Sequence, residues 1–295
     1  DRRQRLQRGR MATRPTGAPV VPATRDDPVL SSRARMPLHE KKVIAVLPAY
    51  NAERTLQATY DDIPQDWVDE ILLVDDVSKD RTVELSRELG LRTVVHQKNR
   101  GYGGNQKTCY RTAIDEMDGE IMVMVHPDHQ YDPKIIPELV KPLLRGECDA
   151  VFGSRMLGGR PIEGGMPKWK YFANLFLTMV ENATFYVYLS EYHSGFRAYS
   201  KRYLETVNFE ANSDDFVFDT EIIAQGVAKG LRIREVPIQT RYFDEASQVG
   251  FWRGARYGLA ILKTMIYYKL HKKKIWSHPI FRDRTPATTT APAGA

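Results

Sequence analysis

Four groups of polar residues that could bind a ligand each follow a short apolar run. Each run has the length of a buried strand, and in a parallel sheet the carboxyl ends of the strands meet along one edge, where ligands bind. We therefore expect the four groups to come together in one site. They are Pro48–Asn51, Asp75–Asp76, Gln97–Gly104 and His126–Asp128.

Asp75 and Asp76 stand directly after the apolar run Glu70–Val74. A carboxylate in that place can accept hydrogen bonds from a nucleobase N–H or from a ribose hydroxyl. The alternative is that an aspartate caps the next helix, a role that Ser78 or Asp80 could also fill. The sequence leaves both interpretations open.

His126, Asp128 and Gln130 follow a further apolar run, Ile121–Val125. A divalent metal that bridges a diphosphate prefers oxygen ligands, which Asp128 and Gln130 offer. A nitrogen from His126 suits Mn²⁺ better than Mg²⁺. The pattern fits either a Mg²⁺ or Mn²⁺ site or a polar turn closed by Pro127 with a hydrogen-bonded histidine, and by itself it favours the polar turn.

The glycine-rich turn Asn99-Arg-Gly-Tyr-Gly103 precedes a helical pattern. Glycine lets the backbone approach a ligand closely, and a helix N-terminus attracts anions. We therefore expect Asn99, Gly101 and Gly103 beside a bound nucleotide. The turn has neither the phosphate-loop pattern of ATPases nor the dinucleotide fingerprint, which disfavours both of those classes.

The elements that position these groups alternate between strands and helices. Such alternation predicts an α/β fold with a mainly parallel sheet flanked by helices. The expected strands are 43–47, 70–74, 92–96, 120–125 and 148–153. The expected helices begin near Glu53 and cover 79–89, 103–117 and 133–144.

The charge is divided unevenly along the 295 residues. Residues 1–42 hold 11 Lys or Arg against 4 Asp or Glu, and residues 263–295 hold 7 against 1, whereas the middle holds 25 against 32. An acidic body disfavours nucleic acid as a partner, because phosphate-backbone binding needs clustered cations on the folded surface. We expect residues 1–36 to be a disordered basic N-terminal tail and 285–295 to be disordered as well.

Two features bear on the compartment. Two cysteines are too few for a disulfide framework, and no apolar run reaches the roughly 18–20 residues of a membrane span, so we predict a cytoplasmic protein. Residues 250–276 form an amphipathic helical pattern in which aromatic and basic residues alternate. This segment is either an interfacial anchor on an anionic membrane surface, which would make the protein peripheral on the cytoplasmic face, or a helix packed on the domain.

The order and spacing of six motifs resemble the family 2 inverting glycosyltransferases of the GT-A fold, in particular the dolichyl- or polyprenyl-phosphate mannose or glucose synthase branch. The resemblance covers about residues 42–245. The motifs are Leu47-Pro-Ala-Tyr-Asn-Ala-Glu53, Val74-Asp-Asp-Val-Ser-Lys-Asp80, Asn99-Arg-Gly-Tyr-Gly103, His126-Pro-Asp-His-Gln130, Gly153-Ser-Arg155 and Ser194-Gly-Phe-Arg197.

The resemblance implies a nucleotide-sugar donor, of the GDP-mannose or UDP-glucose type, and a divalent cation. It implies that Asp75 or Asp76 holds the base or ribose and that Asp128, with Gln130, carries the metal. His126 stands where the family usually has a first aspartate. The residues that would line the base and ribose pocket are Pro48, Tyr50, Asn51 and Glu53.

The acceptor is left open between a lipid phosphate and a glycan or other soluble hydroxyl compound. A phosphate monoester is already largely ionised at neutral pH and needs cations to hold it, for which Arg155, Arg160 and Lys168 are candidates. A hydroxyl acceptor needs a positioned carboxylate, for which Asp214, Asp215 and Asp219 are candidates. A third hypothesis is a nucleotide-binding protein without transferase activity.

Overall fold

The computed structural model describes residues 37–158, 161–239 and 251–283. The expected tails 1–36 and 285–295, and Arg160, lie outside the described residues. Within them, seven strands form one sheet in the order β3-β2-β1-β4-β6-β5-β7. All neighbours are parallel except β6, which runs antiparallel to both β4 and β5, so the predicted mainly parallel sheet is confirmed.

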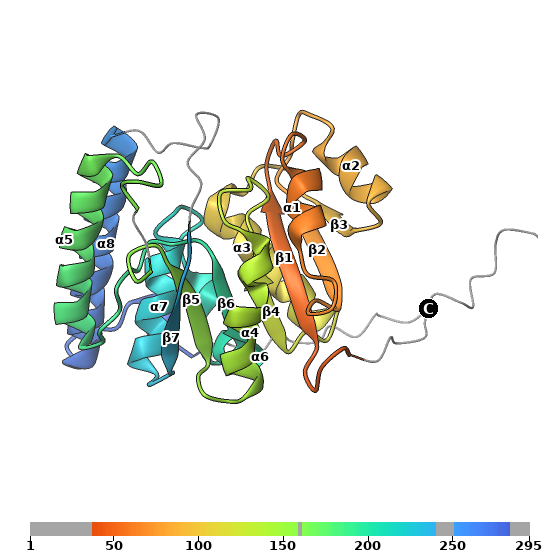
Figure 1. Cartoon of the computed structure of the whole chain (residues 1–295). Coiled ribbons are helices and arrows are strands. Elements are labelled where there is room, and N and C mark those ends of the chain that lie inside the picture. The colour runs from red at the N-terminus through yellow and green to blue at the C-terminus, as the bar shows by residue number, and fades with distance from the viewer. Residues whose placement is uncertain (1–36, 159–160, 240–250, 284–295) are drawn as a thin grey trace, which may run out of the picture. The chain divides into compact units, whose positions relative to one another are not determined.

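The elements follow the predicted alternation closely (Figure 1). Helix α3 begins at the glycine-rich turn two residues earlier than expected, and the expected helix 133–144 is a 3₁₀ turn, η2, followed by α4. Two short strands, β6 and β7, were not among those expected from the apolar runs. The strands are β1 (Val43–Ala49), β2 (Glu70–Asp75), β3 (Arg92–Val95), β4 (Ile121–Met124), β5 (Ala150–Ser154), β6 (Arg197–Ser200) and β7 (Ile233–Pro237). The helices are α1 (Leu56–Asp62), α2 (Thr82–Glu88), α3 (Gly101–Asp115), α4 (Ile136–Leu144), α5 (Lys168–Phe185), α6 (Lys201–Thr206), α7 (Phe218–Ala228) and α8 (Phe251–Lys272), with 3₁₀ turns η2 (Pro133–Ile135), η3 (Phe209–Ala211) and η4 (Pro279–Phe281).

Two hydrophobic cores lie on the two faces of the sheet, because successive side chains of a strand point to opposite faces. Ile44 and Val46 of β1 pack in the core that includes α3 and α7. Val43 and Ala45 pack in the core that includes α1 and α4. Since β1 and β2 are buried on both faces, their carboxyl ends are held rigidly at one edge of the sheet.

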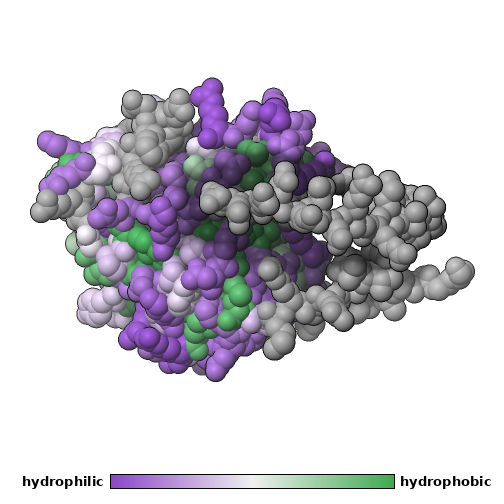
Figure 2. Space-filling model, turned by 45° about the vertical axis from the view of Figure 1, so that its right-hand side comes forward, coloured by the Kyte–Doolittle hydropathy of each residue, from purple (hydrophilic) through white to green (hydrophobic). Residues whose placement is uncertain are grey.

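Helices α5 and α8 pack against each other beside the sheet (Figure 1). Both carry large apolar side chains that are exposed: Trp169, Phe172, Leu175, Phe176 and Met179 on α5, and Trp252, Leu259 and Ile266 on α8. On the face shown in Figure 2, hydrophobic residues appear as separate patches between hydrophilic ones. Among the described residues, no helix is both long and apolar enough to cross a bilayer.

Candidate functional site

One cavity of about 1730 Å³ collects most of the predicted site residues. It extends from the loops after β1, β2 and β4 to the space between α5 and α8. Five predicted residues, Asp75, Gly103, Lys168, Asp214 and Asp215, do not line it. The predicted residues that do line it are Pro48, Tyr50, Asn51, Glu53, Asp76, Asn99, Gly101, His126, Asp128, Gln130, Arg155 and Asp219.

The loop after β1 is fastened to the loop after β2 by reciprocal hydrogen bonds. The Asn51 N–H donates to Ser78 Oγ at 2.8 Å, and Asn51 Oδ1 accepts from the Lys79 N–H at 2.8 Å. Glu53 Oε2 likewise accepts from the Arg81 N–H at 3.1 Å. Asn51 and Glu53 therefore shape this end of the cavity by holding its walls together.

Asp76 holds the N-terminus of α3. Its Oδ1 accepts from the Arg100 N–H at 2.7 Å and lies 2.7 Å from His96 Nδ1, and its Oδ2 accepts from the Gly101 N–H at 3.0 Å. These N–H groups belong to the first turn, which has no partners within the helix. The capping role considered for the two aspartates thus fits Asp76, although the helix it caps is α3 and not the next helix, α2.

Asp75 differs from Asp76 in that one of its carboxylate oxygens accepts no hydrogen bond from the described residues. Its Oδ2 accepts from the Ser78 N–H at 2.9 Å. Its Oδ1 is buried and has no hydrogen-bond partner within the described part of the chain. A buried acceptor without a donor is costly, and Asp75 does not line the cavity.

The glycines of the turn before α3 accommodate another segment of the chain. A Cβ on Gly103 would lie 2.3 Å from the Ser213 carbonyl oxygen, and one on Gly101, whose φ is +76°, would lie 2.8 Å from the Asp214 carbonyl oxygen. The Gly103 N–H donates to that Asp214 carbonyl at 2.8 Å. The close approach that we expected from a ligand is therefore made by the loop before α7.

Two of the three candidate carboxylate bases, Asp214 and Asp215, lie outside the cavity. Asp214 Oδ1 forms an ion pair with Lys107 Nζ at 2.6 Å. Asp215 is exposed, and its Oδ1 accepts from the Phe216 N–H at 2.8 Å. Asp219 does line the cavity, but its carboxylate is already engaged by neighbouring side chains.

Asp128 has the properties of a cation ligand. Burial raises its pKa, its Oδ1 accepts from the Gln130 N–H at 3.1 Å, and no ion pair compensates it among the described residues. A divalent cation would offset this desolvation. Within 37–158, 161–239 and 251–283, no three His, Cys, Asp or Glu side chains form a metal site by themselves, so Gln130 and a substrate would have to complete the ligand set.

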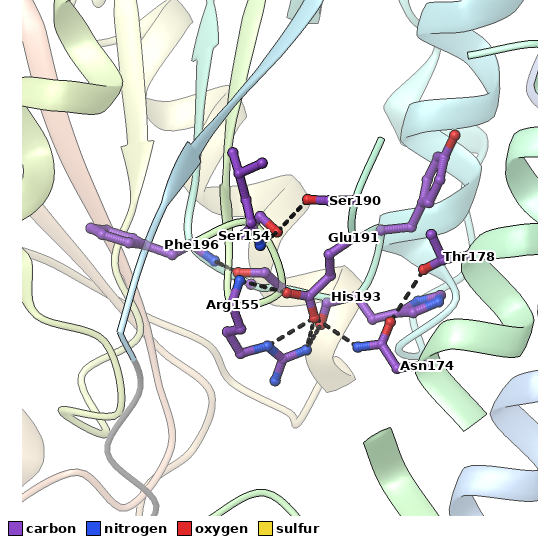
Figure 3. Close-up of polar contacts among 12 residues, drawn as sticks. Ser154, Arg155, Asn174, Thr178, Ser190, Glu191, His193 and Phe196 are labelled. Atoms are coloured by element: carbon purple, nitrogen blue, oxygen red, sulfur yellow. Dashed lines mark hydrogen bonds and ion pairs between the residues drawn. The ribbon is translucent and has the colours of Figure 1, made fainter. Parts of the chain in front are cut away.

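Arg155 is held in a buried polar network (Figure 3). Its backbone N–H and its Nε each donate to Glu191 at 2.8 Å, and its terminal nitrogen contacts the same carboxylate. Asn174 Nδ2 of α5 also donates to Glu191, at 2.8 Å. Burial alone would raise the pKa of Glu191, but the neighbouring Arg155 guanidinium holds that pKa below its ordinary value.

Two further cations line the part of the cavity near α5 and α8. Lys170 of α5 is half-buried, and burial together with Arg155 lowers its pKa. Arg253 of α8 lies at the same end. Apolar and small side chains from the two helices, including Phe176 and Leu259, line the rest of it. This end can hold an anion beside an apolar chain.

Sequence reasoning missed several cavity residues, of which Tyr102 is the most informative. Tyr102 lies within the glycine-rich motif, but only Asn99, Gly101 and Gly103 of that motif were predicted to be site residues. Tyr257 was treated only as part of the amphipathic pattern 250–276, and Lys170 was not among the candidate site residues. No local pattern identifies them, because they reach the cavity only when α5 and α8 pack together.

Similarity to known proteins identifies the fold and the family of this chain. The fold matches glucosyl-3-phosphoglycerate synthase from Mycobacterium tuberculosis, crystallised with Mn²⁺, UDP and glucosyl-3-phosphoglycerate, with a TM-score of 0.58, 22% identity, and coverage of 78% of this chain and 80% of that one. The fold is therefore that of the GT-A glycosyltransferases. Residues 44–207 match the model of glycosyl transferase family 2, and the chain belongs to that family.

Two curated relatives align over most of their length. One is the UDP-N-acetylglucosamine–dolichyl-phosphate N-acetylglucosaminyltransferase of Methanococcus voltae, 26% identical over 79% of this chain and 98% of the relative. The other is the dolichyl-phosphate hexose transferase of Haloferax volcanii, 26% identical over 76% of this chain and 94% of the relative. The resemblance to the polyprenyl-phosphate branch of the family is confirmed.

Proposed function

We propose that this protein transfers a hexose from a nucleotide sugar to a polyprenyl phosphate, with inversion at the anomeric carbon. One observation carries the proposal: a single cavity joins the loops at the strand ends, through Asp128, to a cationic and apolar region between α5 and α8. The names of the two curated relatives support the same acceptor class. The donor is of the GDP-mannose or UDP-glucose type.

The donor occupies the end of the cavity beside β1 and β2. Pro48, Tyr50 and the loop fastened by Asn51 and Glu53 line the base and ribose pocket. Asp128, with Gln130 and His126, holds Mg²⁺ or Mn²⁺. The cation, when bound, offsets the negative charge that grows on the departing nucleoside diphosphate.

The acceptor phosphate lies near Arg155, Lys170 and Arg253. Its second pKa is about 6, so at neutral pH it is already ionised and needs cations and no base. Asp214 and Asp215 lie outside the cavity, and the Asp219 carboxylate already accepts hydrogen bonds from Tyr102 and Gln106, which favours this acceptor over the hydroxyl alternative. The isoprenoid chain leaves between α5 and α8.

The exposed faces of α5 and α8 meet the membrane that holds the lipid. Aromatic and aliphatic side chains are exposed on these helices, and Arg256, Lys263 and Lys269 of α8 are exposed among them. This combination suits an anionic membrane surface. Both cysteines are unpaired, which suits a reducing compartment and supports a position at the cytoplasmic face of the membrane.

The function is tested by incubating the purified protein with a panel of GDP- and UDP-sugars, Mn²⁺ or Mg²⁺, and polyprenyl phosphate in mixed vesicles. One donor is expected to yield a lipid-linked sugar. Asp128→Asn is expected to lower the turnover by about 10³-fold, because the metal's charge stabilisation amounts to several kcal/mol. Asp61→Asn, on the exposed part of α1, is the matched control.

The outcomes separate the alternatives. If the protein transfers sugar to a soluble glycan, and if Asp214→Asn or Asp215→Asn abolishes this transfer, the acceptor is a hydroxyl compound and not a lipid phosphate. Nucleotide binding without transfer or hydrolysis, across all donors and metals, would make the protein a silent nucleotide-binding protein. Full turnover of Asp128→Asn in EDTA would refute the metal role.

Membrane binding is tested separately with vesicles that do or do not contain anionic lipid. The variants are Phe172→Asp and Met179→Asp, whose side chains are 64% and 60% exposed on α5. Both are expected to lower co-sedimentation with anionic vesicles while the melting temperature stays unchanged. Leu38→Asp, at another exposed apolar residue, should bind as the wild type does. Equal binding by all variants would contradict the proposed surface.

A further inference from the structure

The imidazole of His126 is held in one orientation by two neighbours. Its ring lies nearly parallel to that of Tyr102, with an interplanar angle of 14°, and its Nε2 is 3.4 Å from the Tyr102 hydroxyl. A Cβ on residue 195 would lie 2.7 Å from the same Nε2, so only the glycine present there leaves room for the ring. The Nε2 edge of His126 therefore faces the protein.

The Tyr102 hydroxyl has already used its proton. It donates to Asp219 Oδ2 at 2.9 Å. Asp219 also accepts from Gln106 Nε2 at 3.3 Å and lies 3.5 Å from the Arg197 guanidinium. Because every neighbour of this carboxylate is a donor, it acts as an acceptor towards Tyr102, and the tyrosine oxygen is left to accept from His126.

This order of donors fixes the tautomer of the histidine. The proton lies on Nε2, which faces the Tyr102 hydroxyl and Gly195, so the lone pair of the ring lies on Nδ1. The ring lines the cavity close to Asp128, so its free lone pair is available at the place where a cation is expected.

We infer that Tyr102, backed by Asp219, is a positioning residue that presents His126 Nδ1 as a nitrogen ligand to the divalent cation, and that the site thereby prefers Mn²⁺ to Mg²⁺. This inference rests on the metal-dependent function proposed above. Histidine ligands are commonly oriented in this way by a hydrogen bond to the other ring nitrogen. Mg²⁺ accepts nitrogen poorly, whereas Mn²⁺ tolerates it, which gives the stated preference.

The experiment uses the full chain labelled with ¹⁵N, with Mn²⁺ and unlabelled UDP or GDP as probes. Pulsed electron paramagnetic resonance is expected to detect a ¹⁵N nucleus bound to Mn²⁺ in the wild type. His126→Ala should lose the signal, which assigns the nitrogen. Tyr102→Phe keeps the aromatic contact with Phe216 but removes the acceptor, and it should weaken Mn²⁺ binding by about 10–100-fold.

Tyr110→Phe is the matched control, because Tyr110 lies on the same helix and its buried hydroxyl donates to Gln106 and does not contact His126. This variant should keep both the ¹⁵N coupling and the wild-type Mn²⁺ affinity. The affinity for nucleotide without metal, and the melting temperature, should be the same in Tyr102→Phe and wild type. Those two readouts separate positioning of the histidine from a general structural role.

Bound Mn²⁺ without ¹⁵N coupling in the wild type would overturn the inference. Unchanged coupling and affinity in Tyr102→Phe would overturn the positioning role. Nitrogen coupling in a protein that transfers no sugar from any donor would refute the proposed function and leave the inference standing. Sugar transfer by a wild-type protein that does not bind Mn²⁺ would refute the inference about Tyr102 and His126 and leave the proposed transferase activity standing.

Discussion

Glu221 of α7 provides a quantitative test of the loop that closes against α3. Its side chain is 7% exposed, and its Oε2 accepts from the Ser213 N–H at 2.6 Å. Burial raises its pKa from 4.5 to about 7, against the smaller opposing effects of that hydrogen bond, Lys107 and Lys263. The folded protein therefore binds a proton at pH values at which the unfolded chain has lost it.

The sign of the effect on stability follows from this difference. Between about pH 4.5 and pH 7 the folded state holds more protons, so raising the pH lowers the free energy of unfolding. At 1.36 kcal/mol for each pKa unit, the full loss is about 3 kcal/mol above pH 7. Below pH 4.5 the folded and unfolded states both hold the proton on Glu221, so the free energy of unfolding is not lowered.

Glu221→Gln removes the titrating group and keeps an oxygen that can accept from Ser213. It is expected to be about 3 kcal/mol more stable than the wild type at pH 8 and nearly equal to it at pH 4.5. Urea unfolding followed by circular dichroism at both values measures the difference. Glu205→Gln, at an exposed residue of α6, is the control and should show no such trend. A Glu221→Gln difference that does not change with pH would refute the reasoning.

Two further predictions concern the network around the cavity. Arg155→Ala leaves Glu191 buried without its cation and should lower the free energy of unfolding by about 3–5 kcal/mol, measured by denaturant titration. Gly195→Ala places a methyl group against His126 and should cost about 1–3 kcal/mol through overpacking. It should also lower kcat/KM for sugar transfer, and full activity at an unchanged melting temperature would contradict this.

The sequence predicted the parallel strands because their signal is local. β1, β2 and β4 are apolar on both faces, so the runs themselves mark them as buried strands, and each ends at the polar group expected there. β6 has only four residues and begins inside a motif that was quoted for its chemistry. Its antiparallel place between β4 and β5 depends on contacts distant in the sequence, which no local pattern contains.

The roles of individual site residues were harder to predict than their presence. Asp76 and the glycines of the α3 turn were expected to contact a nucleotide, and that contact stays a prediction. In the structure Asp76 holds the α3 N-terminus and Gly103 packs against Ser213, while Asp76 and Gly101 also line the cavity. A polar residue at a strand end can bind either a ligand or a neighbouring loop. The choice depends on which loop approaches, and that is decided by tertiary packing.

Hydrogen bonds shape one end of the cavity and apolar helices shape the other, so the two ends should recognise different ligands. The end beside β1 and β2 is fixed by backbone hydrogen bonds to Asn51, Glu53 and Asp76, so its shape is already present before a ligand binds. The other end is walled by α5 and α8, whose outer faces are apolar and exposed. Binding to a preformed pocket requires little ordering, whereas the helical end gains its full complement of contacts only when apolar material covers it. Recognition of the donor should therefore depend on a few hydrogen bonds, and recognition of the acceptor on an apolar surface with an anion at its inner end.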